Sequence, residues 1–230
     1  MNELFLNSAT MGVVLSFLAY EVGILIKNKM KKAVFNPLLI SIVIVIAVLL
    51  IFNVDYDSYN QSAKYISYLL TPATVSLAIP LYRQLDLLKE NFMSIALGIL
   101  SGVLTSLISI LGMSVVFGLT HEEYVTLLPK SITTAIGMGV SEELGGYVTI
   151  TVVVIIITGI LGNIIGSFAC NLFQIQNPIS KGLALGTSSH AIGTTKAMEM
   201  GEIEGAMSSL SIVVAGLMTV VLASVFAMIY

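Results

Sequence analysis

Charged side chains are scarce in this sequence: Asp, Glu, Lys and Arg together make up 10% of its residues, whereas hydrophobic residues make up 57%. Soluble domains carry about one quarter charged residues, so this composition excludes an ordinary water-soluble surface. Charge-free runs cover residues 4 to 20, 33 to 54, 65 to 82, 92 to 120, 147 to 180 and 205 to 230. Most of these runs are long enough for the ~20 helical residues that cross a bilayer core of ~30 Å. The composition therefore predicts an integral membrane protein.

The membrane-spanning runs are predicted to be helices, because a backbone in lipid must satisfy its own hydrogen bonds. Spanning β-strands alternate apolar and polar residues, whereas residues 42 to 51 are continuously apolar. We predict an all-α, polytopic membrane protein with about eight transmembrane segments, some of them discontinuous. It is expected to form a single integral membrane domain over residues 1 to 230. Two amino-terminal spans are expected in residues 1 to 64, and repeated helix pairs in residues 65 to 230.

Further absences exclude other classes of protein. The single cysteine, Cys170, excludes an internal disulfide and a cysteine metal cluster. A net charge of −3 without a basic patch argues against a nucleic-acid partner. His121 is expected in an outside loop and His190 has no ligand partner at helical spacing, so no metal site is expected. The sequence also has no phosphate loop, His-Glu-x-x-His motif or Gly-x-Ser-x-Gly elbow, so we expect neither catalytic residues nor a cofactor.

The distribution of lysine predicts the orientation in the membrane. Four lysines follow the first apolar run: Lys27, Lys29, Lys31 and Lys32. The positive-inside rule places this loop in the cytoplasm and the amino terminus outside. The same rule places residues 83 to 90 inside and residues 120 to 124 outside. Because no basic region or cleavage site precedes Lys27, the first run is expected to remain as an anchor.

Two short segments, residues 129 to 145 and 182 to 199, resemble each other. TTAIG begins at residue 133 and SHAIG at residue 189, and at equal spacing they are followed by Glu143 and Gly145, and by Glu199 and Gly201. Internal repeats with interrupted helices are typical of transporters. The alternative is a chance similarity, since membrane sequences use few residue types. The sequence leaves open whether these segments cross the membrane or re-enter it.

The same two segments carry polar side chains in an otherwise apolar chain. Polar groups at membrane depth are costly, so they usually face a bundle interior or a watery cavity and indicate function. One cluster is PKSITT at residues 129 to 134, and the other is GTSSHAIGTTK at residues 186 to 196. The residues predicted to bind a ligand are Lys130, Ser131, Thr133, Thr134, Ser189, His190, Gly193 and Thr194.

Lysine, hydroxyls and broken helix ends together suit a carboxylate. A half-helix of about twelve residues reaches ~18 Å, which is near the middle of the bilayer. Its positive amino-terminal end would there support an anion. Two alternatives stay open: Lys130 as an interfacial lysine whose ammonium reaches the lipid headgroups, and His190 as a packed structural histidine instead of a proton carrier.

Five stretches of the sequence closely resemble the LrgB/CidB family of bacterial membrane proteins. They are LTPATV at residues 70 to 75, IPLY at 79 to 82, LPKSITT at 128 to 134, SHAIGT at 189 to 194 and GAMSSL at 205 to 210. The likeness covers nearly the whole chain from residue 5. Ala135 departs from the family pattern, which often has proline there. The resemblance implies a multi-pass protein of the bacterial cell membrane that works with a small LrgA/CidA-type membrane partner.

The resemblance implies two competing functions. One is transport of small 2-oxo or 2-hydroxy monocarboxylates such as pyruvate, glycolate or glycerate. The other is antiholin-like regulation of murein hydrolase activity and autolysis. Apart from these two, the chain could be a structural subunit that anchors the small partner. The repeated hydroxyl, lysine and histidine clusters, which are expected at membrane depth, favour transport, because a regulator has no need of them. Paired glycines at residues 98 and 102, and at 162 and 166, permit close helix packing within the chain or in a homo-oligomer.

Overall fold

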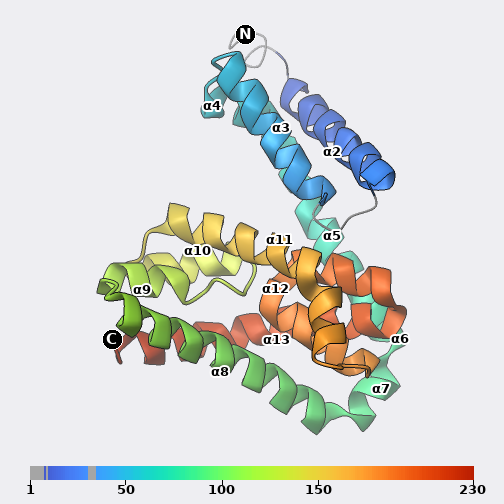
Figure 1. Cartoon of the computed structure of the whole chain (residues 1–230), viewed down its shortest axis with the longest axis vertical. Helices are drawn as coiled ribbons and strands as arrows, with labels where there is room; N and C mark the ends of the chain where they lie inside the picture. Colours follow the sequence, from blue (N-terminus) through green and yellow to red (C-terminus); the bar gives the residue numbers. More distant parts are fainter. Residues whose placement is uncertain (1–7, 9, 31–34) are drawn as a thin grey trace. The chain divides into compact units, whose positions relative to one another are not determined.

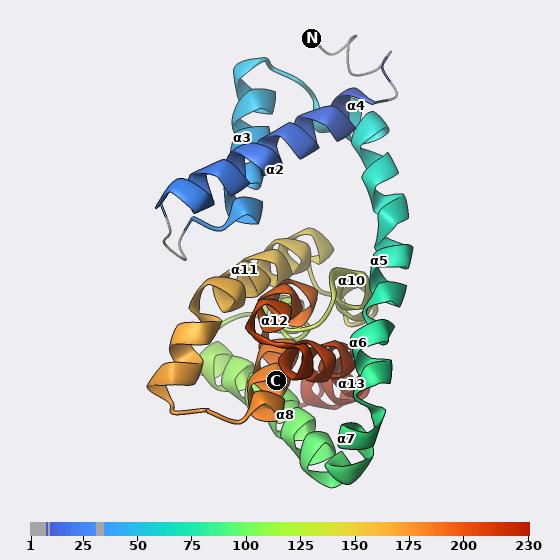
Figure 2. The same cartoon turned by 90° about the vertical axis from the view of Figure 1, so that its right-hand side faces the viewer.

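The structure is a computed structural model that describes residue 8, residues 10 to 30 and residues 35 to 230. Every regular element in these residues is helical, so the predicted all-α class is confirmed. The chain divides into two compact units, Met1–Ser76 and Leu77–Tyr230. Figures 1 and 2 show the helices of each unit.

The first unit is built on two apolar helices. Its elements are α2 (Met11–Met30), α3 (Pro37–Ile51), α4 (Tyr56–Ala63), η1 (Lys64–Leu69) and α5 (Leu70–Ser76). Asn36 begins α3 by accepting a hydrogen bond from the Leu38 amide at 2.8 Å. Gly23 lets α2 approach α3, since a Cβ there would lie 2.6 Å from the Pro37 carbonyl oxygen. The Ser16 and Tyr59 hydroxyls lie 2.7 Å apart and join α2 to α4.

The second unit contains the longer helices. Its elements are α6 (Ala78–Arg83), α7 (Leu85–Glu90), α8 (Phe92–Phe117), α9 (His121–Leu127), α10 (Thr134–Glu143), α11 (Val148–Leu172), α12 (Pro178–Met200) and α13 (Glu202–Ala227). In Figure 1, α9 and the carboxyl terminus lie at one end of this unit, and α6 and α7 lie at the other.

Among the described residues, four helices are long and apolar enough to cross a membrane: α2, α8, α11 and α13. Helix α3 is apolar but has only 15 residues. The predicted count of about eight spans is not confirmed. One reason is that the apolar run at residues 65 to 82 is divided among the short elements η1, α5 and α6.

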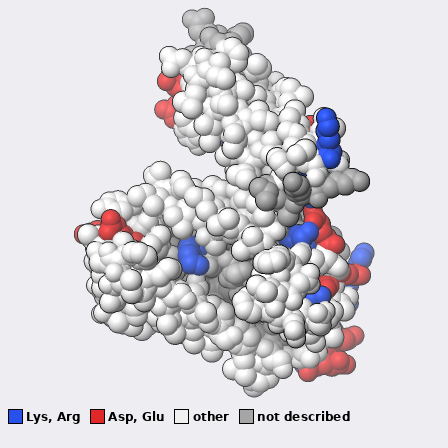
Figure 3. All heavy atoms as spheres, viewed as in Figure 1, with Lys and Arg blue, Asp and Glu red and all other residues white. Residues whose placement is uncertain are grey.

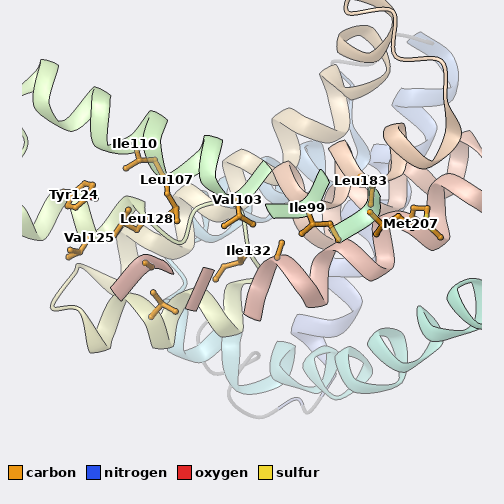
Figure 4. Close-up of a cluster of buried hydrophobic side chains, with 14 of the residues drawn as sticks. Ile99, Val103, Leu107, Ile110, Tyr124, Val125, Leu128, Ile132, Leu183 and Met207 are labelled. Atoms are coloured by element: carbon orange, nitrogen blue, oxygen red, sulfur yellow. The ribbon is translucent and has the colours of Figure 1, made fainter. Parts of the chain in front are cut away.

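The core of the second unit follows one face of α8. Ile95, Ile99, Val103, Leu107 and Ile110 recur every three or four residues, and all are buried. Figure 4 shows two partners of this stripe, Tyr124 and Leu128, toward one end of α8 and two others, Leu183 and Met207, toward the other. This core therefore runs along most of α8.

Helix α12 packs closely against its neighbours through glycines. On α8, Cβ atoms at Gly98 and Gly102 would lie 3.1 Å from Leu183 Cδ1 and 2.9 Å from Thr187 Oγ1. On α11, the space left by the glycine at residue 162 is filled by Ser189. The glycine pairs thus serve packing within the chain, which is one of the two uses that their spacing permits.

Candidate functional site

Helices α9 and α10 form a hairpin around the loop at residues 128 to 133. At its tip, a Cβ on Gly137 would lie 3.5 Å from the Pro129 carbonyl oxygen. Beyond the end of α10, the Tyr147 amide donates to Thr126 Oγ1, in the last turn of α9, at 2.7 Å. The chain therefore enters the unit along α9 and turns back along α10 to the level of Thr126. We call this the α9–α10 hairpin.

Helix α12 also folds back, because its two halves are separated by non-helical backbone at Ser189 (φ −136°, ψ 15°) and His190 (φ 42°, ψ −138°). A Cβ on Gly186, before the break, would lie 2.5 Å from the Ser208 carbonyl oxygen. After the break, Thr194 Oγ1 lies 2.7 Å from Ser208 Oγ. Both halves thus meet α13 at the same level, and residues 182 to 199 turn back at the break. We call this the α12 hairpin.

The two hairpins start from opposite ends of α13. Tyr124 of α9 donates its hydroxyl to the Phe226 carbonyl at 3.0 Å, near the end of α13. The second half of α12 instead meets the beginning of α13, where a Cβ on Gly205 would lie 2.9 Å from Met198 Cγ. Because α13 is a single helix, the α9–α10 and α12 hairpins point toward each other.

Helix α11 holds both hairpin tips at one residue, Ile155. The Ile155 side chain fills the space beside Gly137 of the α9–α10 hairpin. His190, at the tip of the α12 hairpin, has its Nε2 3.0 Å from the Ile155 carbonyl oxygen. Since a carbonyl only accepts, Nε2 carries the proton in this contact. The two segments singled out in the sequence therefore meet on one turn of α11.

Side chains add hydrogen bonds to the first turns of the second half of α12. Asn163 of α11 donates its amide to the Ile192 carbonyl at 2.8 Å and to Thr195 Oγ1 at 2.9 Å. Thr194 donates its hydroxyl to the His190 carbonyl at 3.0 Å. These bonds fix the second half of α12. Asn163 was not predicted as a polar contact, although an amide inside a charge-free run is a signal for one.

Two cavities lie beside the hairpin tips. The first, which we call the α11 cavity, has a volume of about 470 Å³. It is bordered by Lys130, by Phe173 just after α11, and by residues of α11 and α12 that include Thr158, Ala169, Ser188 and Ser189. The second, the α8 cavity, measures about 420 Å³ and is bordered by Ser101, Thr105, Ser106, Ser109, Met113, Lys130, Ser131, Thr187 and Ser188. Lys130 and Ser188 border both. Figure 3 shows a hollow in this face with a basic patch beside it, and the other charged groups in this view lie toward the edges.

The ammonium group of Lys130 lies among hydroxyls. Its Nζ donates to Ser131 Oγ at 3.0 Å, and that oxygen lies 3.2 Å from Ser106 Oγ of α8. Within the described part of the chain, no carboxylate lies within 4.0 Å of this ammonium. An ammonium has three donors, and a cation away from bulk water is stable only with partners. The site therefore presents a positive charge that an anion can neutralise.

The structure brings some of the predicted ligand residues to the cavities and places others behind them. Lys130, Ser131 and Ser189 border a cavity. Thr133 and Thr134 begin α10 and are half-buried. Like Thr133 and Thr134, the remaining three residues border neither of these two cavities, and they are buried at or behind the α12 tip: His190, Gly193 and Thr194.

Sequence reasoning did not find the hydroxyl wall that α8 contributes. Ser101, Thr105 and Ser109 recur every four residues within a charge-free run, which puts them on one face of a helix. That spacing was the available signal. Ser106, between them, completes the wall and meets the Lys130 loop through Ser131.

Comparison with known proteins gives consistent matches over most of the chain. The LrgB-like family matches residues 16–229. The antiholin-like protein LrgB of Bacillus cereus (strains B4264 and AH187) is 38% identical over 216 residues, which cover 94% of either chain. The protein of the same name from Bacillus anthracis (strain CDC 684 / NRRL 3495) matches equally well. No solved structure matches.

Proposed function

This chain belongs to the LrgB-like family of membrane proteins. From the geometry of its site we propose that it is a carrier for small 2-oxo or 2-hydroxy monocarboxylates such as pyruvate, glycolate or glycerate. The observation that carries the proposal is the Lys130 ammonium. It borders two cavities at the meeting point of two hairpins and has no carboxylate within 4.0 Å in the described residues.

A small carboxylate fits the chemistry of this site. The carboxylate neutralises the lysine through a charge-assisted hydrogen bond, which is roughly twice as strong as a neutral one. The hydroxyls of Ser131, Ser188 and Ser189 offer donors to the remaining oxygens, including the 2-oxo or 2-hydroxy group. Helix α10 and the second half of α12 both begin at the tips, so their positive ends add to the charge of Lys130.

The order of elements supports a carrier as well. The α9–α10 hairpin is followed by the long helix α11, and the α12 hairpin is followed by the long helix α13. The two pairs run in opposite directions, which is the arrangement of inverted repeats. Transporters built from such repeats bind their substrate where discontinuous helices meet near the bilayer midplane. We therefore interpret the resemblance between TTAIG and SHAIG as one of structure.

The names of the relatives favour a second candidate, antiholin-like regulation. In that function the chain would act on autolysis through a small LrgA/CidA-type membrane partner and would need no substrate. A structural subunit that only anchors the partner would likewise bind no carboxylate. The two alternatives thus differ from a carrier in one measurable property, which is saturable substrate uptake.

The test is uptake of labelled pyruvate and glycolate by proteoliposomes that contain the purified chain under an imposed pH gradient. A second preparation contains the small LrgA/CidA-type partner as well. Saturable uptake that short monocarboxylates inhibit supports the carrier. Absence of uptake from both preparations, with correctly folded protein, would contradict it and favour regulation.

A further inference from the structure

The α8 cavity and the α11 cavity extend in opposite directions from Lys130. Along α11, the α11 cavity runs from Thr158, near the middle of the helix, past Ala169 to Phe173 and Ile175, beyond its end. Along α8, the α8 cavity runs from Ser101, in the middle third of the helix, to Met113, near its end.

These two helix ends lie at opposite ends of the unit. The end of α8 lies at the α9 end, where Tyr230 donates its hydroxyl to the Leu119 carbonyl at 2.7 Å. The end of α11 leads through a short connection to the start of α12, at the other end. A Cβ on Gly166 of α11 would contact Leu185, in the first half of α12. The cavities therefore approach Lys130 and Ser188 from opposite ends.

Polar groups in the α8 cavity call for water or ligand. The hydroxyls of the α8 wall donate to carbonyls of their own helix. Ser101 donates to the Gly98 carbonyl at 2.8 Å, and Thr105 donates to the Ser101 carbonyl at 2.7 Å. Their oxygens keep acceptor capacity on the cavity side. Lys130 uses one donor on Ser131, and its other two donors remain available in a cavity that the α8 hydroxyls also border. These groups offer polar partners to water or to a ligand along the middle of α8.

We propose that the α8 cavity and the α11 cavity are two half-channels that open on opposite sides of the membrane, separated by a septum at Lys130 and Ser188. The identity of the transported substrate rests on the proposed carrier function, whereas the two openings rest on geometry alone. With the orientation predicted from the lysines, the α8 half-channel opens outside and the α11 half-channel opens to the cytoplasm.

The septum is made by the tips of the two hairpins. Lys130 belongs to the loop of the α9–α10 hairpin, and Ser188 precedes the break in α12. A displacement of either tip would open the site to one side while the other tip stays closed. The outer wall of the α11 half-channel is mainly apolar, so an anion finds no strong partner there before it reaches Lys130.

Cysteine labelling tests the two openings without any substrate. Single cysteines are placed in a Cys170→Ala background, which removes the only native thiol. Ser109→Cys reports on the α8 half-channel, and Ala169→Cys reports on the α11 half-channel. Sealed right-side-out and inside-out vesicles are treated with a membrane-impermeant methanethiosulfonate reagent. Met113→Cys and Ile165→Cys provide a second pair if either first variant folds poorly.

We expect the two cysteines to react from opposite sides of the membrane. Their neighbours provide matched controls, Ile108→Cys and Phe168→Cys, whose side chains are 56% and 67% exposed on the outer surface of the helices. The half-channel cysteines should react at least about tenfold faster than these, because only a hydrated thiol ionises to the reactive thiolate.

Reaction of both cysteines from the same side, or rates no higher than those of the controls, would overturn the two half-channels. The carrier proposal fails separately. If the labelling pattern is as expected and no carboxylate is taken up, the half-channels stand and the substrate assignment falls.

Discussion

Replacement of Lys130 by methionine is the sharpest test of the site, since methionine keeps much of the side-chain length and removes the charge. The ammonium has a single hydrogen bond, to Ser131, and no carboxylate within 4.0 Å in the part of the chain that the structure describes. Loss of a charged hydrogen bond to a substrate carboxylate costs about 1.5–3 kcal/mol. At 1.4 kcal/mol for each factor of ten, binding should weaken roughly 10- to 150-fold.

The same substitution should leave the folded state intact. Removal of one partner from a buried ion pair costs about 3–5 kcal/mol, but here no acid is left uncompensated. We therefore expect the melting temperature of the Lys130→Met protein without substrate to be equal to or above that of the native chain. The stabilisation of the native chain by pyruvate should at the same time be lost.

The assay is thermal unfolding of the purified protein in detergent over a series of pyruvate concentrations, followed by uptake in proteoliposomes. Lys89→Met is the matched control, because Lys89 forms a surface pair with Asp86 at 3.7 Å and lies far along the chain from the site. Unchanged pyruvate binding in Lys130→Met would refute the anion site. A decrease in melting temperature as large as that expected for a broken buried ion pair would refute the inference that removal of Lys130 leaves no acid uncompensated.

Three further predictions concern the α12 tip. Gly162→Ala should destabilise the protein by about 1–3 kcal/mol, since the new methyl group meets Ser189, whereas Gly112→Ala, which has open space, should not; thermal unfolding compares the two. Asn163→Leu removes two hydrogen bonds to the second half of α12 and should cost about 1–3 kcal/mol, and faster hydrogen exchange confined to residues 190 to 200 would identify the cause. His190→Gly should be more stable than His190→Ala by about 1 kcal/mol, because both lose the ring and only glycine adopts φ 42° without strain; equal melting temperatures would contradict this.

Much of this fold follows from composition, because the physics of a bilayer leaves few alternatives. The helical class, the family and the two polar segments around Lys130 and His190 were all predicted. The number of spans was not. The charge-free run at residues 65 to 82 has the length of one span, but hydropathy reports transfer into lipid and not the continuity of a helix. Pro72 and Pro80 lie within that run, and the structure divides it into three short elements.

The part of the site that sequence reasoning missed lies on a separate element. Thr105 and Ser109 are more than twenty residues from Lys130 in the chain, and only the folding back of the α9–α10 hairpin brings the Lys130 loop to them. The same limit applied to His190. Its residue type allowed two hypotheses, a proton carrier and a packed structural histidine, and the contact of its ring with the backbone of α11 depends on the fold and not on the local sequence.

Ile155 contacts the two hairpin tips in two different ways, and the two contacts respond differently to mutation of this residue. The contact with Gly137 is made by the side chain, so every amino-acid replacement at position 155 alters it. The contact with His190 is made by the main-chain carbonyl, which every amino acid supplies. Substitution at this position can therefore change the packing of the α9–α10 hairpin while the α12 hairpin keeps its hydrogen bond. The attachment of the α9–α10 hairpin to α11 is therefore more sensitive to substitution of this residue than the attachment of the α12 hairpin.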